Sequence, residues 1–162
     1  MIKMQRSDTL IQSGRLNPGR KTALLAALPV VYERNYSYLL ELIPELGSLH
    51  DRTRITLSAI EHLEIVIREQ SPFTTVLDID HVLDNAHLPD LGMSIRAYHD
   101  ARMAEVIRYQ RHSRIQPSYA YPNKAMYQPL EKRQINLFFS DWLRHCFTIS
   151  WQTGIQTTPT ST

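Results

Sequence analysis

The stretch Met93–Gln110, MSIRAYHDARMAEVIRYQ, decides the fold that the sequence predicts. Its two halves mirror each other about Asp100-Ala101. With those two residues as a turn, the facing pairs are Arg96 and Glu105, Ile95 and Val106, and Ala97 and Ala104. This register puts small and branched apolar side chains on one face and a charge pair on the other, so it predicts an antiparallel hairpin.

Upstream of this hairpin, apolar residues alternate with polar ones from Arg54 onward, as they do in half-buried strands. The predicted core faces are Ile55, Leu57 and Ala59, then Leu63, Ile65 and Ile67, and then Phe73, Thr75, Leu77 and Ile79. Ser71-Pro72 supplies a turn between the second and third of these strands. With the hairpin, the pattern predicts an antiparallel sheet of about five strands.

Helical spacing flanks the predicted sheet on both sides. Residues 29–43 begin with Pro29, which suits a helix start, and Pro44 disfavours helical geometry at the residue before it. From Leu130 an apolar stripe returns and includes Phe139, Trp142 and Cys146. The predicted fold class is therefore α+β, with one helix before the sheet and one long amphipathic helix after it.

The length of 162 residues suits one domain, which we place at 29–151. Residues 1–28 are predicted to form a basic, largely irregular arm, and residues 152–162 a disordered polar tail. The single cysteine excludes an internal disulfide framework. No apolar run is long enough for a membrane span, and we expect a cytoplasmic protein without a membrane partner.

The net charge of +2 conceals strongly charged segments. Residues 24–101 carry five basic and twelve acidic side chains, a net charge of −7, whereas residues 108–133 carry +5 and residues 1–23 carry +4. Residues 108–133 also interleave tyrosines with the cations, a composition that binds single-stranded nucleic acid or nucleotides in other proteins. Nucleic-acid or nucleotide binding through this segment is therefore one hypothesis, and neutralisation of the acidic segment is the structural alternative.

Two stretches of sequence look like ligand-binding motifs but do not fit the residue pattern that such motifs require. Gly14–Thr22 nearly spells a phosphate-binding loop, but Arg20 stands where the motif needs lysine directly after the second glycine. The Asp and His residues of 78–90 fit neither an EF-hand loop nor histidines one helical turn apart, so a solvated acidic loop is the interpretation. We therefore expect no cofactor and no metal.

His99 and Asp100 are the candidate catalytic pair, because a carboxylate beside a histidine can orient it as a general base. Adjacent strand residues point to opposite faces, so the pair requires the chain to bend there. The structural alternative is a turn-capping aspartate beside a surface or half-buried histidine. Cys146 lies on the apolar stripe and is not expected to act as a nucleophile.

Three blocks of sequence resemble the YqiB-like family of proteobacterial proteins of unknown function. The blocks are Tyr98–Ala101 with Ala104–Val106, then Tyr121–Lys124, then a helical block that includes Glu131, Gln134, Asn136, Asp141–Leu143 and Cys146. The resemblance runs from about Tyr32 to Cys146. It implies a bacterial cytoplasmic protein, and it implies no known activity, cofactor or catalytic residue.

The leading functional hypothesis is a non-enzymatic binding or adaptor module whose partner is another protein. Its candidate binding residues are Tyr98, His99, Asp100, Tyr121, Asn123, Lys124, Glu131 and Gln134. An enzyme acting on a small anionic substrate is the alternative, with His99 as base, Asp100 as its orienter and Lys124 as anion anchor. On a purely structural interpretation, Asn123, Glu131 and Gln134 hydrogen-bond the irregular backbone of residues 113–129.

Overall fold

The computed structural model describes residues 27–49, 51–84, 90–112, 129–154 and 160–161. In these residues it shows an antiparallel sheet, with one long helix before its first strand in the sequence and one after its fifth. In chain order the elements are α2 (Leu28–Leu42), the 3₁₀ helix η1 (Leu46–Ser48), β1 (Arg52–Thr56), β2 (Glu61–Gln70), β3 (Thr74–Leu83), β4 (Asp90–Tyr98), β5 (Met103–His112), α3 (Pro129–Thr153) and β6 (Thr160–Ser161). The sheet order is β5-β4-β3-β2-β1-β6, and all pairs are antiparallel. The predicted α+β class is confirmed, with one helix before and one after a five-strand meander.

The hairpin of β4 and β5 has the register that the sequence predicts. Arg96 faces Glu105, and the flanking apolar pairs are Ile95 with Val106 and Ala97 with Ala104. The turn is wider than the expected two residues, because the last pair joins Tyr98 to Met103. Arg102 closes this turn with a φ of 51°, in the left-handed region that non-glycine residues seldom adopt.

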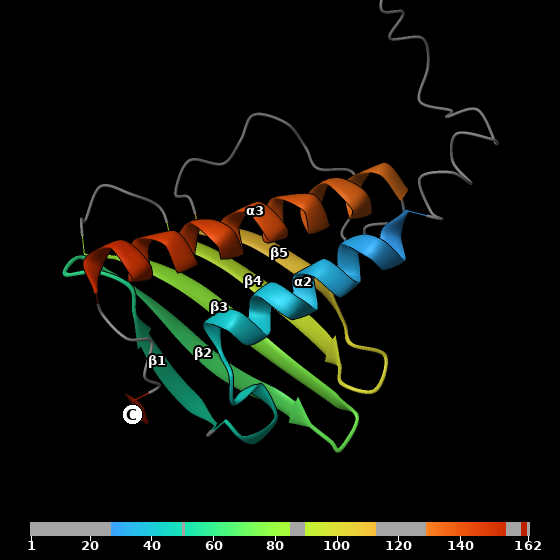
Figure 1. The fold of residues 1–162 in the computed structure, drawn as a ribbon, viewed down its shortest axis with the longest axis horizontal. Helices are drawn as coiled ribbons and strands as arrows, with labels where there is room; N and C mark the ends of the chain where they lie inside the picture. The colour runs from blue at the N-terminus through green and yellow to red at the C-terminus, as the bar shows by residue number, and fades with distance from the viewer. Residues whose placement is uncertain (1–26, 50, 85–89, 113–128, 155–159, 162) are drawn as a thin grey trace, which may run out of the picture.

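Both helices lie on the same face of the sheet (Figure 1). α2 begins with Pro29 in its first turn and ends before Pro44, as the sequence predicts. The inward-facing residues of β1 to β5 and the apolar stripes of α2 and α3 form one core cluster, centred on side chains such as Leu39, Ile79 and Phe139. The opposite face of the sheet carries the polar side chains of each alternating strand.

Four side chains depart from the predicted pattern. Phe73 was expected on a core face but lies in the turn before β3 and is 65% exposed. Ala59 lies in the turn after β1 and is exposed. Conversely, Asn136 and Ser140 of α3 are completely buried, although their polarity assigns them to the solvent side of an isolated helix.

The ends of the described chain have some regular structure. α3 continues to Thr153, and Thr160–Ser161 pairs with Arg54 and Thr53 of β1, within the range expected to be an irregular tail. Of the predicted arm, residues 1–28, residues 1–26 lie outside the described residues, and Leu28 already belongs to α2. In the part of the chain that the structure describes, no helix is both long and apolar enough to cross a membrane.

Candidate functional site

His99 lies at the end of the β4–β5 hairpin and is held by two other elements. Its Nδ1 is 3.1 Å from the Tyr36 hydroxyl of α2, and its Nε2 is 2.8 Å from Oγ1 of the buried Thr75 in β3. Its backbone N–H donates to the carbonyl of Phe73. Both ring nitrogens thus have hydroxyl partners within the protein, an arrangement that positions the hairpin end against α2 and β3.

Asp100 follows His99 in the turn, and its side chain is exposed. Among the described residues no hydrogen bond or ion pair joins the two side chains, so the expected orienting contact is absent from this part of the structure. Lys124, the proposed anion anchor, lies outside the described residues. The enzyme hypothesis therefore stays a prediction, with His99 occupied by structural partners.

A second polar cluster surrounds Glu105 at the edge of the sheet. Its carboxylate accepts a hydrogen bond of 2.9 Å from the Tyr98 hydroxyl and forms an ion pair of 2.9 Å with Lys132 of α3. Tyr98 reaches Glu105 because it lies two residues after Arg96, the direct partner of Glu105, and is therefore its diagonal neighbour on the same face of the hairpin. The Lys132 ammonium also lies 5.9 Å from the ring centre of Tyr32 in α2. Two helices and the hairpin thus meet at one carboxylate.

This cluster shifts the pKa values of its members. Burial raises the pKa of Glu105, but the hydrogen bonds from Lys132 and Tyr98 and the positive charges of Lys132 and Arg96 together lower it by more, so it lies below the usual value. Burial lowers the pKa of Lys132, whereas its contacts with Glu105 raise it above the usual value. Burial raises the pKa of Tyr32. At neutral pH the cluster holds a carboxylate and an ammonium that stabilise each other.

Beneath this cluster two asparagines, each 0% exposed, join both helices to β5. The side-chain oxygen of Asn136 accepts from the Val106 N–H at 2.9 Å and from Nδ2 of Asn35 at 3.2 Å. Nδ2 of Asn136 donates to the Lys132 carbonyl at 2.8 Å, and Nδ2 of Asn35 lies 3.4 Å from the Ala104 carbonyl. β5 is an edge strand, so these asparagines satisfy backbone groups that β4 does not use.

The asparagine network continues toward α2 through Ser140. The Ser140 hydroxyl donates to the side-chain oxygen of Asn35 and accepts from Nε of Arg34 at 3.2 Å. From the sequence, Asn136 is predicted only as a polar residue of the family-like helix, and Asn35 is not among the predicted residues. The signal that was present is a polar residue in the middle of each apolar stripe, which an amphipathic helix does not require.

The remaining candidate residues are not brought to one site within the described chain. Glu131 is half-buried and Gln134 is exposed on α3. Tyr121, Asn123 and Lys124, together with residues 113–128 of the proposed nucleic-acid segment, lie outside the described residues. The structure therefore unites Tyr98 with Glu105 and Lys132, and His99 with Tyr36, as two neighbouring polar clusters.

The Asp and His residues of β3 are separated by the sheet itself. Asp78 and Asp80 face the side without helices, whereas His81 is buried on the other side, where it accepts a hydrogen bond of 3.3 Å from the Trp142 indole. Within the described residues, no three metal-ligating side chains gather at one point. Cys146 is 0% exposed, and burial raises the pKa of its thiol far above the usual value.

The sequence of this chain matches a known protein family. Residues 38–151 match the family model described as "Protein of unknown function (DUF1249)", so the chain belongs to this family. The matched range contains η1, every strand from β1 to β5 and nearly all of α3. It also contains the β4–β5 hairpin that carries both polar clusters.

Named relatives come from Escherichia coli. The uncharacterized protein YqiB of strain K12, of O6:H1 strain CFT073 and of O157:H7 is in each case 35% identical over 115 residues, which is 70% of this chain and 81% of the relative. The expected YqiB-like family of unknown function is confirmed. No solved structure matches the chain significantly.

Proposed function

We propose that this protein is a non-enzymatic binding module that recognises another protein through two stacked aromatic side chains at the end of α3. Phe147 is 39% exposed and Trp151 is 79% exposed. Their ring centres are 6.4 Å apart and the ring planes are inclined by 23°. A stacked tryptophan exposed to water is the kind of side chain that dominates binding energy at protein interfaces.

The position of this pair supports a binding role. The end of α3 lies against the segment that follows β1, where the Thr153 hydroxyl is 2.8 Å from the Leu57 carbonyl. Both aromatics fall within the range that matches the family, and Trp151 is its last residue. The pair is therefore held on a rigid helix and loses little conformational entropy on binding. Its chemistry suits a partner protein that offers an apolar pocket to an indole ring.

The test uses the protein as an affinity bait in a bacterial lysate, with retained proteins quantified for matched variants. We expect Trp151→Ser and Phe147→Ser to lose a partner that wild type retains. Val30→Ser is the control, because Val30 is a 66% exposed apolar residue elsewhere on the surface. The proposal fails if every protein retained by wild type is also retained by Trp151→Ser.

A second measurement locates the interface with the purified partner. The chain has two tryptophans, and Trp142 is only 5% exposed, so iodide quenching of fluorescence reports mainly on Trp151. Bound partner should protect Trp151 from iodide. Tyr121→Ala and Lys124→Ala test the earlier hypothesis of a surface at the hairpin end. If these two variants, and not Trp151→Ser, lose the partner, the binding surface lies there instead.

A further inference from the structure

β1 lies near an edge of the sheet that the chain covers only in part. On one side, all five residues of β1 pair with β2. On the other side, the two residues of β6 pair with Thr53 and Arg54. In the part of the chain that the structure describes, Ile55 and Thr56 have no strand partner on that side. An open strand edge is a ready template for pairing with another chain.

The opposite edge of the sheet is protected in a different way. There the amides of Asn35 and Asn136 bond the Ala104 carbonyl and the Val106 N–H of β5. Side chains that bond the outward backbone groups of an edge strand block the addition of a further strand. The helices therefore close the β5 edge, whereas the β1 edge is closed only by the short strand β6.

A buried hydroxyl marks the β1 edge as incomplete. Thr53 is 1% exposed, and within the described chain its Oγ1 has no hydrogen-bond partner. It lies directly opposite Ser161 of β6, on the side of the sheet that carries the helices. Buried polar atoms without a partner are unfavourable and rare in native proteins. The Thr53 hydroxyl is thus open to a side chain that arrives opposite it on an added strand.

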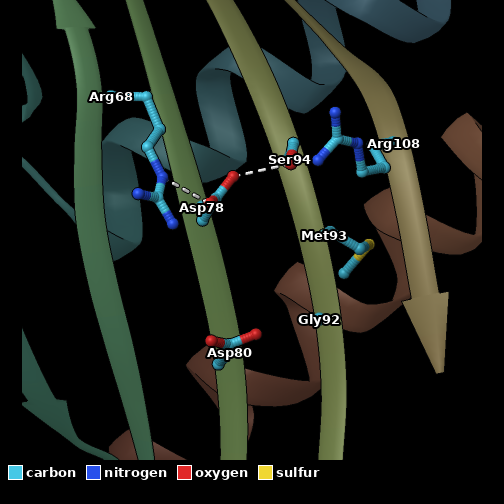
Figure 2. Close-up of a pocket in the computed structure, with 7 residues that line it drawn as sticks. All are labelled: Arg68, Asp78, Asp80, Gly92, Met93, Ser94 and Arg108. Carbon is cyan, nitrogen blue, oxygen red and sulfur yellow. Dashed lines mark hydrogen bonds and ion pairs between the residues drawn. The ribbon is translucent and has the colours of Figure 1, made fainter. Parts of the chain in front are cut away.

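Polar groups on the open face of the sheet already have partners. A hollow of about 250 Å³ lies there over β3 and β4 (Figure 2). The Asp78 carboxylate in it is 2.6 Å from Arg68 Nε and accepts a hydrogen bond of 2.6 Å from the Ser94 hydroxyl. Asp80 also has an interaction partner within the protein. The β1 edge, with its unpartnered buried hydroxyl, is therefore the stronger indication of a ligand.

The exposed side chains of β1 give this edge a positive charge. Arg52 and Arg54 alternate with the buried residues of the strand and are exposed on the open side of the sheet. Arg54 forms an ion pair of 2.9 Å with Glu64 of β2, whereas Arg52 forms no ion pair within the described residues. On an added strand, acidic residues opposite these arginines are favoured and basic residues are disfavoured.

We propose that the β1 edge binds an extended peptide segment of another protein as an added antiparallel strand, in place of β6. Main-chain hydrogen bonds supply the affinity in this mode of recognition, and alternate side chains supply the specificity. An asparagine opposite Thr53 carries both a donor and an acceptor and reaches further than the Ser161 hydroxyl. An apolar residue opposite Ile55 and acidic residues opposite the two arginines complete the pattern.

In this arrangement β6 is a short occupant from the same chain that competes with the peptide. It pairs with two residues of β1, whereas a peptide can pair with all five. The site differs from the aromatic pair on α3, so this inference does not depend on the proposed function.

The test titrates the ¹⁵N-labelled full chain with the end-blocked peptide Thr-Val-Glu-Asn-Glu. In the antiparallel register of β6 its residues oppose Thr56 to Arg52 in that order. We expect saturable shifts of the β1 amides. A peptide with leucine in place of asparagine should bind about tenfold more weakly, because the Thr53 hydroxyl then stays without a partner. A peptide with lysines in place of the glutamates should also bind more weakly.

Variants of the protein connect this binding to the β1 edge. Thr53→Val should remove the preference for asparagine over leucine, and it should stabilise the free protein because the unpartnered hydroxyl is gone. Thr56→Val is the matched control, because it removes an exposed hydroxyl from the same strand. The double variant Thr160→Pro with Ser161→Pro removes the N–H donors of β6 and should tighten peptide binding about tenfold.

Three results would overturn the proposal. One is that the asparagine peptide gives no saturable shifts of the β1 amides up to about 10 mM. Another is that Thr53→Val prefers asparagine over leucine as strongly as wild type does. The third is that the double proline variant binds the peptide no more tightly than wild type, since β6 then does not occupy the same edge.

Discussion

Replacement of Asn136 by alanine tests whether the buried asparagines hold the two helices to the sheet edge. The change removes the acceptor of the Val106 N–H and of the Asn35 amide, and the donor to the Lys132 carbonyl. A buried donor left without a partner costs about 1–3 kcal/mol. Asn35 retains its longer contact with the Ala104 carbonyl, so the cost of its lost hydrogen bond to Asn136 lies at the lower end of that range. The expected loss of unfolding free energy is about 3 kcal/mol.

Urea unfolding at equilibrium measures this loss. With a denaturant slope of about 2 kcal/mol per molar, the midpoint should fall by roughly 1.5 M. Gln134→Ala on the exposed side of the same helix is the matched control and should change stability by less than about 0.5 kcal/mol. Hydrogen exchange of the Val106 amide should accelerate in Asn136→Ala only, because that N–H loses its acceptor.

Replacing both Asn35 and Asn136 by alanine separates the energy of the hydrogen bond between them from the cost of shortening each side chain. Because the two amides bond each other, the combined loss should be about 1 kcal/mol smaller than the sum of the single losses. A loss below about 1 kcal/mol for Asn136→Ala, or an unchanged Val106 exchange rate, would refute the reasoning.

Three further predictions concern the polar clusters and the cysteine. Because the pKa of Glu105 is lowered in the folded protein, its contribution to stability is present above its unfolded pKa of about 4.3 and is lost as the pH falls through the folded pKa. Lys132→Met should flatten this dependence of stability on acid pH and should lower the stability at pH 7 by less than about 1 kcal/mol. An unchanged dependence on acid pH would contradict the pairing of Lys132 with Glu105. Tyr36→Phe, which removes the hydroxyl beside His99, should lower stability by about 1 kcal/mol in thermal unfolding, and a neutral effect would show that the contact contributes nothing. Burial raises the pKa of Cys146, so the stability of the protein should fall as the pH rises above about 8.5, where only the unfolded chain loses the thiol proton. Alkylation of Cys146 by iodoacetamide should likewise require unfolding, because the side chain is buried. Rapid labelling of the native protein would contradict this prediction.

The sequence by itself determined the elements and the pairing of the central hairpin. Facing pairs such as Arg96 and Glu105 lie nine residues apart in the chain and are fixed by a symmetric pattern about one turn. The helix limits at Pro29 and Pro44 are equally local, because proline acts on its own and the preceding residue. These features depend on interactions between residues that are close in the sequence, so they can be predicted from the spacing of residue types along the chain.

The tertiary structure decided which polar residues are buried and what they contact. Asn35 and Asn136 are 101 positions apart, and only the way in which α2 and α3 lie over β5 brings their amides together. His99 gains its partners from α2 and β3 in the same manner. Such contacts follow from the packing of separate elements, which the period of a single segment does not encode.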